Sequence, residues 1–339
     1  MSSTVEVIAE VAQGFEGRPE QASLLLKAAA SAGADAVKYQ LIYADELAAP
    51  DYKHYALFRS LEMSDDVWVA LAAQAATLGI QLQLDIFGTR SLALAERLKV
   101  GAVKLHGTDI SNIALLEAVA KSDAPRVLLG AGGSHRSELE RALTVLAAKP
   151  VVVLLGFQAY PTPDETNQIA RVRQLAAAWQ TRFPQVQLGF ADHVSPEGPV
   201  RDALAAVAMG AGATVIEKHL TLGRSMQLED FESALNPDEF RQFVATMRGC
   251  AAALGQCADA DDFAMSAAEV GYRQTIRRHV VAARDLPAGA TLSPQDLVLK
   301  RTPASDAVTD LQRAYGAVIP RALAKDAPLL VSDLPEAPR

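Results

Sequence analysis

The stretch Ala213–His219, ATVIEKH, decides the fold. Three β-branched residues followed by an acid, a lysine and a histidine are typical of a buried parallel strand with polar groups at its carboxyl end. A second stretch, Gly189–His193, GFADH, has the same form. In α/β proteins the reacting groups gather at the carboxyl ends of parallel strands. The two stretches therefore predict neighbouring strand ends with a histidine each, which could share one metal ion. From the spacing alone, a shared metal ion and two ordinary histidines at strand ends are equally well supported.

Strand-like and helix-like stretches alternate with short connections through the first 254 residues. Ala- and Leu-rich segments between the strands predict helices, among them Asp65–Leu78 and Asp164–Thr181, and Pro237–Leu254 is the last. Eight βα units in about 250 residues have the size of a (β/α)8 TIM barrel, an α/β fold. A doubly wound open sheet is the alternative, but no G-x-G-x-x-G follows the first strand. The predicted strands are Val5–Glu10, Ala34–Gln40, Ile80–Phe87, Ala102–His106, Arg126–Gly130, Pro150–Phe157, Val186–Asp192 and Thr214–His219.

The regular alternation of strand-like and helix-like stretches ends at Leu254. Residues 255–275, which include the acidic run ADADDF, are predicted to be a linker after the barrel of residues 1–254. In residues 276–339, short apolar pieces alternate with Pro-Ala-Gly and Ser-Pro turns, which indicates a small β-rich domain. A domain of this size is expected to cover the barrel mouth or to mediate assembly. The apolar pieces are His279–Ala283, Leu297–Lys300 and Leu329–Ser332.

Charge and composition exclude several classes of protein. The 339 residues carry a net charge of −8, which argues against a nucleic-acid partner because phosphate backbones are bound by concentrated Lys and Arg. The sequence contains no uninterrupted run of about 18 apolar residues, so no membrane span is expected. The chain has two cysteines and no basic, apolar signal segment at its N-terminus. A cytoplasmic protein with free thiols is the simplest interpretation.

Lysines stand near the carboxyl ends of three predicted strands, at Lys38, Lys104 and Lys218. Lysine is rarely buried without a partner, and each of the three could belong to a structural ion pair. Three lysines that converge on one barrel mouth predict an anion-binding pocket instead. Tyr160, in a proline-stiffened loop, and His106, after the fourth strand, are expected to line the same mouth.

These motifs resemble those of the sialic acid (N-acetylneuraminate) synthase family, in order and over nearly the whole chain. The tail from Arg277 to Arg301 is similar to that family's C-terminal SAF, or antifreeze-like, domain. The resemblance implies a TIM-barrel enzyme that condenses phosphoenolpyruvate with an N-acyl-mannosamine-type sugar. It also implies a divalent metal, Mn²⁺ or Mg²⁺, and a domain-swapped homodimer in which each SAF domain caps the other chain's barrel. The motifs are Ile8–Glu10, Gly33–Gln40, Ala159–Pro161, Asp192–His193, Val215–His219 and Arg224–Met226, with Asp230 and Leu235.

The same resemblance implies roles residue by residue. His193 and His219 would hold the metal, which polarises the sugar's aldehyde. Lys38 and Lys104 would pair with the carboxylate and the phosphate of the donor. Arg301 would reach the N-acyl group in the neighbouring chain's barrel. The predicted catalytic residues are Glu10, Lys38, Lys104 and Glu217, and the predicted substrate-binding residues are Gln40, Asp85, Gln158, Tyr160, Lys218, Asp230 and Arg301.

The chain departs from the family's pattern where typical members bind the donor phosphate. Residues 84–88 read LDIFG where the family has Ser-Thr-Pro-Phe-Asp, and residues 104–109 read KLHGTD where it has Lys-Ile-Ala-Ser-Gly-Glu. Backbone N–H groups of Gly107, Gly130, Gly132 and Gly133, with Ser134 close by, could replace the lost hydroxyls. A carboxylate at Asp85 would repel a phosphate unless it pairs with a cation.

Three functions are compatible with these residues. The first is a nonulosonic acid synthase that uses phosphoenolpyruvate and an N-acyl-mannosamine-type or otherwise modified hexose. The second is a related metal-dependent barrel enzyme with a different donor or an aldol-lyase reaction. The third is a catalytically inactive sugar-binding protein, which would have no need of the full set Glu10, Lys38, Lys104, His193, Lys218 and His219.

Overall fold

The computed structural model describes residues 5–157, 159–255 and 265–335. The chain divides into two compact units, residues 1–256 and 257–339, and each is described here by itself. Among the described residues, no helix combines the length and the apolar character needed to cross a lipid bilayer.

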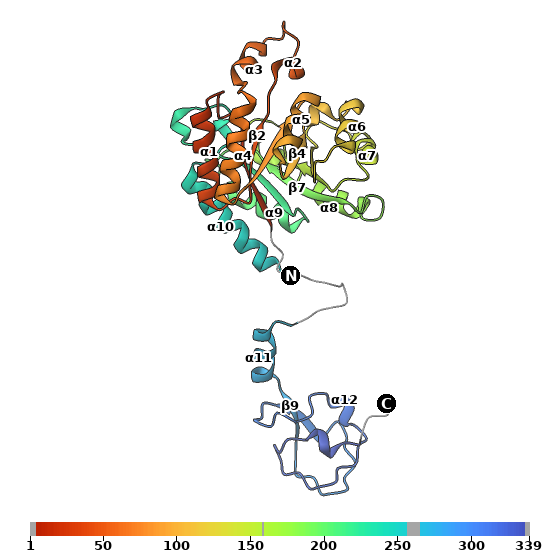
Figure 1. Ribbon diagram of the computed structural model, residues 1–339. Helices are drawn as coiled ribbons and strands as arrows, with labels where there is room; N and C mark the ends of the chain where they lie inside the picture. The colour runs from red at the N-terminus through yellow and green to blue at the C-terminus, as the bar shows by residue number, and fades with distance from the viewer. Residues whose placement is uncertain (1–4, 158, 256–264, 336–339) are drawn as a thin grey trace. The chain divides into compact units, whose positions relative to one another are not determined.

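The first unit is a closed barrel of eight parallel strands, each paired with the next, with β1 paired to β8. Helices surround the strands, as the red-to-green part of Figure 1 shows. The predicted (β/α)8 barrel is therefore confirmed. The strands are β1 (Glu6–Ala12), β2 (Ala36–Gln40), β3 (Gln81–Ile86), β4 (Ala102–Leu105), β5 (Val127–Gly130), β6 (Val151–Leu155), β7 (Val186–Asp192) and β8 (Val215–His219).

The helices follow the predicted rhythm, with two additions after β2. The short helices α2 and α3 lie between β2 and α4, and they extend from one end of the barrel (Figure 1). The helix predicted from Asp164 begins later, because Asp164–Thr166 form a 3-10 turn before α8. The helices are α1 (Pro19–Ala32), α2 (Ala44–Leu47), α3 (Tyr55–Leu61), α4 (Asp65–Leu78), α5 (Thr89–Leu98), α6 (Ile113–Lys121), α7 (Arg136–Val145), α8 (Ala170–Trp179), α9 (Arg201–Gly210) and α10 (Pro237–Leu254).

Strand alternation separates an inner from an outer core. Side chains two residues apart face the same side of a sheet. The inner cluster fills the barrel below the site, and the larger outer cluster packs the strands against the helices. Nearer the carboxyl ends of the strands, the side chains that point into the barrel are polar instead of small and apolar. The inner cluster consists of Ile8, Ala36, Ala102, Leu128, Val152, Leu154, Ala191 and Val215.

The second unit contains the region that resembles a SAF domain. Strands β9 (His279–Ala282) and β10 (Leu297–Lys300) pair antiparallel, and a separate apolar core packs around them. The apolar piece predicted at Leu329–Ser332 is not a strand, because it runs into the 3-10 turn Val331–Asp333. Helix α11 (Ala267–Ile276) occupies the second half of the stretch predicted as a linker, and the short helix α12 (Leu311–Ala314) lies after β10.

Candidate active site

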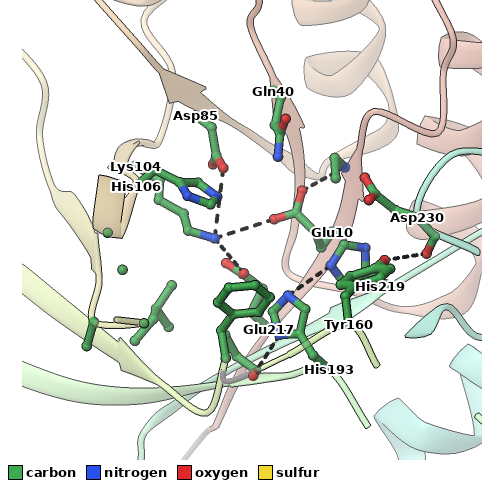
Figure 2. Close-up of a pocket in the computed structure, with 18 of the residues that line it drawn as sticks. Glu10, Gln40, Asp85, Lys104, His106, Tyr160, His193, Glu217, His219 and Asp230 are labelled. Carbon is green, nitrogen blue, oxygen red and sulfur yellow. Dashed lines mark hydrogen bonds and ion pairs between the residues drawn. The ribbon is translucent and has the colours of Figure 1, made fainter. Parts of the chain in front are cut away.

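A pocket of about 320 Å³ opens at the carboxyl ends of the barrel strands, within the size range of small-molecule sites. Polar side chains and small or apolar residues both line it, and Figure 2 labels ten of the polar ones. The polar lining residues are Glu10, Gln40, Asp85, Lys104, His106, Thr108, Tyr160, His193, Glu217, His219 and Asp230. The small or apolar ones are Ala12, Gly107, Gly130, Ala131, Gly132, Leu154, Phe157 and Ala191.

Lys38 lies at the centre of an ionic network beneath this pocket. It is fully buried, bonds to Glu10, its neighbour across the β1–β2 ladder, and donates to Asp85 at 2.7 Å. Its Nζ also lies 3.5 Å from Glu217. Burial lowers the pKa of Lys38 from its ordinary value, and the surrounding carboxylates oppose that shift. The side chain is enclosed by its partners and does not line the pocket itself.

Lys104 is the second cation of the network, and it does line the pocket. Its Nζ bonds to Glu217 at 2.7 Å and lies within 3.9 Å of both Glu10 and Asp85. Figure 2 shows the ammonium group between these three carboxylates. Burial disfavours the charged lysine, but the nearby carboxylates outweigh it and raise the pKa of Lys104. Burial likewise opposes ionisation of Glu217, but Lys104 and Lys38 hold its pKa well below the usual range.

Three carboxylates thus share two ammonium groups. Asp85 Oδ2 and Glu217 Oε2 are buried and accept no hydrogen bond from the described residues. The pair Asp85 and Lys104 are neighbours across the β3–β4 ladder, as Glu10 and Lys38 are across β1–β2. The sheet register therefore builds the network directly.

His193 and His219 face each other at the ends of β7 and β8. Their Nε2 atoms are 3.2 Å apart, and the Nδ1 of His193 lies 3.0 Å from the carbonyl oxygen of Ala191. Burial lowers the pKa of His193 to about 4 and that of His219 well below its ordinary value. Both imidazoles are consequently neutral near pH 7, which is the state that binds metals. Among the described residues, no group of three or more His, Cys, Asp or Glu side chains could hold a metal ion.

Lys218 does not join the other two lysines. As the residue between Glu217 and His219 it faces the opposite side of β8, where it bonds to Asp192 at 2.9 Å and to the carbonyl oxygen of Val194 at 3.1 Å. Lys218 and Asp192 are neighbours in the β7–β8 ladder and both are buried. The prediction that Lys218 lines the pocket is therefore wrong.

The entrance of the pocket is built by the loops after β1, β6 and β8. The Tyr160 hydroxyl donates to the carbonyl oxygen of Asp230 at 2.5 Å, and its ring lies against both site histidines. Gln13 donates its side-chain amide to Gln40 at 2.9 Å and its backbone N–H to the Asp230 carboxylate at 3.1 Å. Burial raises the pKa of Asp230 to about 6.

Gly107 and Gly130 lie where two loops pack closely. A Cβ on Gly107 would lie 2.4 Å from the carbonyl oxygen of Gly132, and one on Gly130 would lie 3.1 Å from the Gly107 nitrogen. The loops after β4 and β5 therefore approach each other too closely for a side chain at Gly107. The amides of Gly132 and Gly133 donate to no acceptor within the described ranges.

The structure brings together most of the predicted site. Gln158 lies outside the described residues, and Arg301 is an exposed residue of the second unit. Sequence reasoning missed Phe157, whose ring lies 4.8 Å from that of His193, and it missed the bridging role of Gln13. For Gln13 a signal existed, because a polar residue directly follows the first strand.

Comparison with known proteins identifies the family. The NeuB family profile matches residues 25–259, and the SAF domain profile matches residues 277–335. The chain belongs to the NeuB family. This NeuB-family chain is 31% identical to the spore coat polysaccharide biosynthesis protein SpsE of Bacillus subtilis, over 74% of the chain and 69% of that protein.

Two further relatives are named as synthases. The N,N'-diacetyllegionaminic acid synthase of Legionella pneumophila is 27% identical, over 93% of this chain and 90% of that protein. The crystal structure of the N-acetylneuraminic acid synthetase of Leptospira borgpetersenii, in complex with citrate, superposes with a TM-score of 0.71 at 25% identity, over 81% of this chain and 93% of that one. The predicted family is confirmed, and with it the prediction of an enzyme of the sialic-acid-synthase type.

Proposed function

We propose that the protein is a nonulosonic acid synthase, which joins phosphoenolpyruvate to the aldehyde of an N-acyl-mannosamine-type or modified hexose in a metal-dependent, aldol-like reaction. Family membership supports the class of reaction, and the named relatives support the class of product. The observation that carries the proposal is the pair of neutral imidazoles, His193 and His219, beside the network of Lys104 and its carboxylates. Both reactants are small free molecules, in keeping with a cytoplasmic enzyme.

The two histidines fit one divalent cation, Mn²⁺ or Mg²⁺. The Nε2 atoms of His193 and His219 are 3.2 Å apart, near enough for one ion to contact both. The carbonyl oxygen of Ala191 takes the Nδ1–H of His193, which leaves the Nε2 lone pair for the ion. When bound, the metal would supply Lewis-acid polarisation of the sugar's carbonyl group.

The chain's own residues would bind the donor and move a proton. Lys104 lines the pocket and would neutralise charge on the donor, with Lys38 supporting it from below. Glu10 is the group expected to transfer a proton, because the amide of Ala12 orients its carboxylate at 2.7 Å.

The test is a product assay with phosphoenolpyruvate, Mn²⁺ and a panel of N-acyl amino-hexoses, in which phosphate release is followed. We expect release that requires both substrates and that is lost in Lys104→Ala but retained in Arg97→Met, a substitution at an exposed ion pair of α5. No phosphate release with any acceptor, from protein that binds Mn²⁺, would contradict the proposal.

Metal binding is tested separately by equilibrium dialysis against Mn²⁺. We expect the parent to bind one ion per chain and the His193→Ala, His219→Ala double variant to bind none, because the two Nε2 atoms supply its protein ligands. His54→Ala, at an exposed position, is the control. Equal Mn²⁺ content in parent and double variant would remove these residues from the metal site.

A different donor is the second candidate function, and one observation favours it. Three carboxylates already compete for Lys38 and Lys104, which disfavours a highly charged phosphate. A donor without a phosphate, such as pyruvate in an aldol-type reaction, would avoid this conflict. Product formation with pyruvate but not with phosphoenolpyruvate would favour the second function over the first.

A further inference from the structure

We propose that His106 binds the phosphate of the donor and takes up a proton as the donor binds. The proposal rests on the proposed function, because the phosphate is that of phosphoenolpyruvate. It gives a role to a pocket residue that none of the steps above uses.

His106 follows β4 and points into the pocket. Residues two apart on a strand face the same side, so His106 continues the inward row of Ala102 and Lys104. Lys104, two residues earlier in the same row, and Asp85 both act on the charge of its ring (Figure 2). The Phe87 ring packs on it, with ring centres 6.1 Å apart. His106 is thus held at the pocket wall next to the lysine predicted to meet the donor.

The His106 imidazole has no polar partner of its own. It makes no hydrogen bond or ion pair with another described residue, unlike the charged residues around it. Burial, together with Lys104 and Lys38, lowers its pKa, and the carboxylates of Asp85 and Glu217 oppose this without outweighing it. In the free protein the ring is therefore neutral and available to a ligand.

The other basic groups of the pocket are already engaged. Lys104 bonds to Glu217 at 2.7 Å, and the Nε2 atoms of His193 and His219 face each other. A phosphate would add negative charge to a pocket that is already acidic. His106 is the protonatable side chain of the described pocket lining that remains without such a partner. The carboxylates of this lining are Glu10, Asp85, Glu217 and Asp230.

The loop after β5, which packs against Gly107 next to His106, supplies hydrogen bonds but no charge. The amides of Gly132 and Gly133 have no acceptor among the described residues, and Gly132 lines the pocket. Successive backbone N–H groups of this kind bind anions. An anion in contact with both would receive neutral donors from these amides and a charge from His106.

Phosphate binding would change the protonation of His106. A negative group within hydrogen-bond distance raises the pKa of an imidazole. A ring that is neutral in the free protein would then take a proton from the solvent when phosphoenolpyruvate arrives at neutral pH. A side chain that only fills space beside Phe87 would not produce this uptake.

The experiment is calorimetric titration of phosphoenolpyruvate into the full-length protein with Mn²⁺ bound, at neutral pH and in buffers of different ionisation enthalpy. The dependence of the binding enthalpy on the buffer gives the number of protons taken up. We compare the parent with His106→Gln, which is neutral, and His106→Arg, which is always charged. His54→Gln, at an exposed position, is the matched control.

We expect His106→Gln to bind about tenfold more weakly, which corresponds to about 1.4 kcal/mol, and to lose most of the proton uptake. His106→Arg should keep affinity nearer to that of the parent but also lose the uptake. Unchanged affinity and uptake in both variants would overturn the inference and leave the proposed function standing. If the parent itself does not bind phosphoenolpyruvate, the proposed donor fails, and this inference fails with it. Thermal unfolding of each variant confirms that it is folded.

Discussion

Asp85 is the residue whose charge most directly opposes a phosphate donor. Its carboxylate holds Lys38 at 2.7 Å and lies 3.9 Å from Lys104. In Asp85→Asn, only two carboxylates, those of Glu10 and Glu217, remain to pair with Lys38 and Lys104. We expect phosphoenolpyruvate to bind more tightly, by about tenfold for each 1.4 kcal/mol of repulsion removed.

Calorimetry on parent and Asp85→Asn protein measures this difference. Asp65→Asn, which removes an exposed carboxylate paired with Arg97, is the control. Weaker binding in Asp85→Asn would mean that Asp85 organises the lysines for the donor and does not repel it.

Asp230 makes stability depend on pH. Burial raises its pKa to about 6, against the opposing hydrogen bond from the Gln13 amide. Between about pH 4 and pH 6 the folded protein holds a proton that the unfolded chain has released. This contribution to the free energy of unfolding is present below pH 4 and is lost as the pH rises through 6.

Urea unfolding of the parent and Asp230→Asn at a series of pH values tests this sign. The free energy of unfolding of the parent, minus that of the variant, should fall by up to about 3 kcal/mol as the pH rises from about 4 to 6. A difference that stays constant, or rises, contradicts the assignment.

Sequence reasoning predicted that the two site histidines and Lys104 line the pocket, and that Lys38 lies close to Lys104. It failed for Lys218, because the prediction did not take into account that successive side chains of a strand point to opposite faces of the sheet. Glu217 and His219 point inwards, so the residue between them points outwards to Asp192. The partners of Lys38 were also not predictable, since Glu10, Asp85 and Glu217 come from three other strands.

At the scale of the elements, the carboxyl ends of β7 and β8 are joined by the buried pair Asp192 and Lys218. Asp192 directly precedes His193 in the sequence, and Lys218 directly precedes His219. Removal of one partner leaves an uncompensated buried charge, which costs about 3–5 kcal/mol. We expect a loss of this size in Lys218→Met, together with weaker Mn²⁺ binding because the two histidines are less firmly positioned.

A double-mutant cycle with Asp192→Asn isolates the pair. The Asp192→Asn, Lys218→Met protein should recover a large part of the stability lost in Lys218→Met. Arg97→Met breaks an exposed ion pair and should cost less than about 1 kcal/mol. If the double variant is as unstable as the sum of the two single variants, the residues do not act as a pair.

The contact between the loops after β4 and β5 predicts a different penalty. Gly107→Ala places a Cβ 2.4 Å from the carbonyl oxygen of Gly132, so one loop must move. We expect a loss of about 1–3 kcal/mol in the free energy of unfolding. Gly210→Ala, at the end of α9 where nothing lies within 4 Å, should be neutral or slightly stabilising. Equal stability of the two variants would contradict the close approach.

The order and type of the barrel elements were predictable because each strand is a short apolar run bounded by turns. The strand Val186–Asp192 and helices such as Asp65–Leu78 and Pro237–Leu254 have the predicted bounds. The short helix α2 was not predictable, since a four-residue helix has no full apolar face. In the second unit, the turn at Val331–Asp333 depends on side-chain bonds of Asp333 that no periodicity indicates.

At the scale of the whole molecule, the dimer remains a prediction. We expect Arg301 to act on the active site of a second chain, as the resemblance to sialic acid synthases implies. A mixture of the inactive Lys104→Ala and Arg301→Ala proteins should then regain activity. In each mixed dimer, one of the two active sites combines an intact Lys104 from one chain with an intact Arg301 from the other.

Light scattering and a tagged-subunit pull-down establish that the chains exchange. Lys300→Ala, which removes a neighbouring exposed cation that pairs with Asp326, is the control for the Arg301 position and should stay active. No recovery of activity in mixtures with proven exchange would place the Arg301 contact within one chain or exclude it.

The pairing of β1 with β8 has a consequence for the newborn chain. One edge of β1 has no partner until His219 has left the ribosome, about 180 residues after the end of β2. At about 5–20 residues per second this interval lasts roughly 10–40 s. During that time β1 exposes an open hydrogen-bonding edge, which invites pairing with other chains. We therefore expect that slower translation of the segment before β8 increases aggregation during synthesis, whereas refolding of the completed chain avoids this hazard.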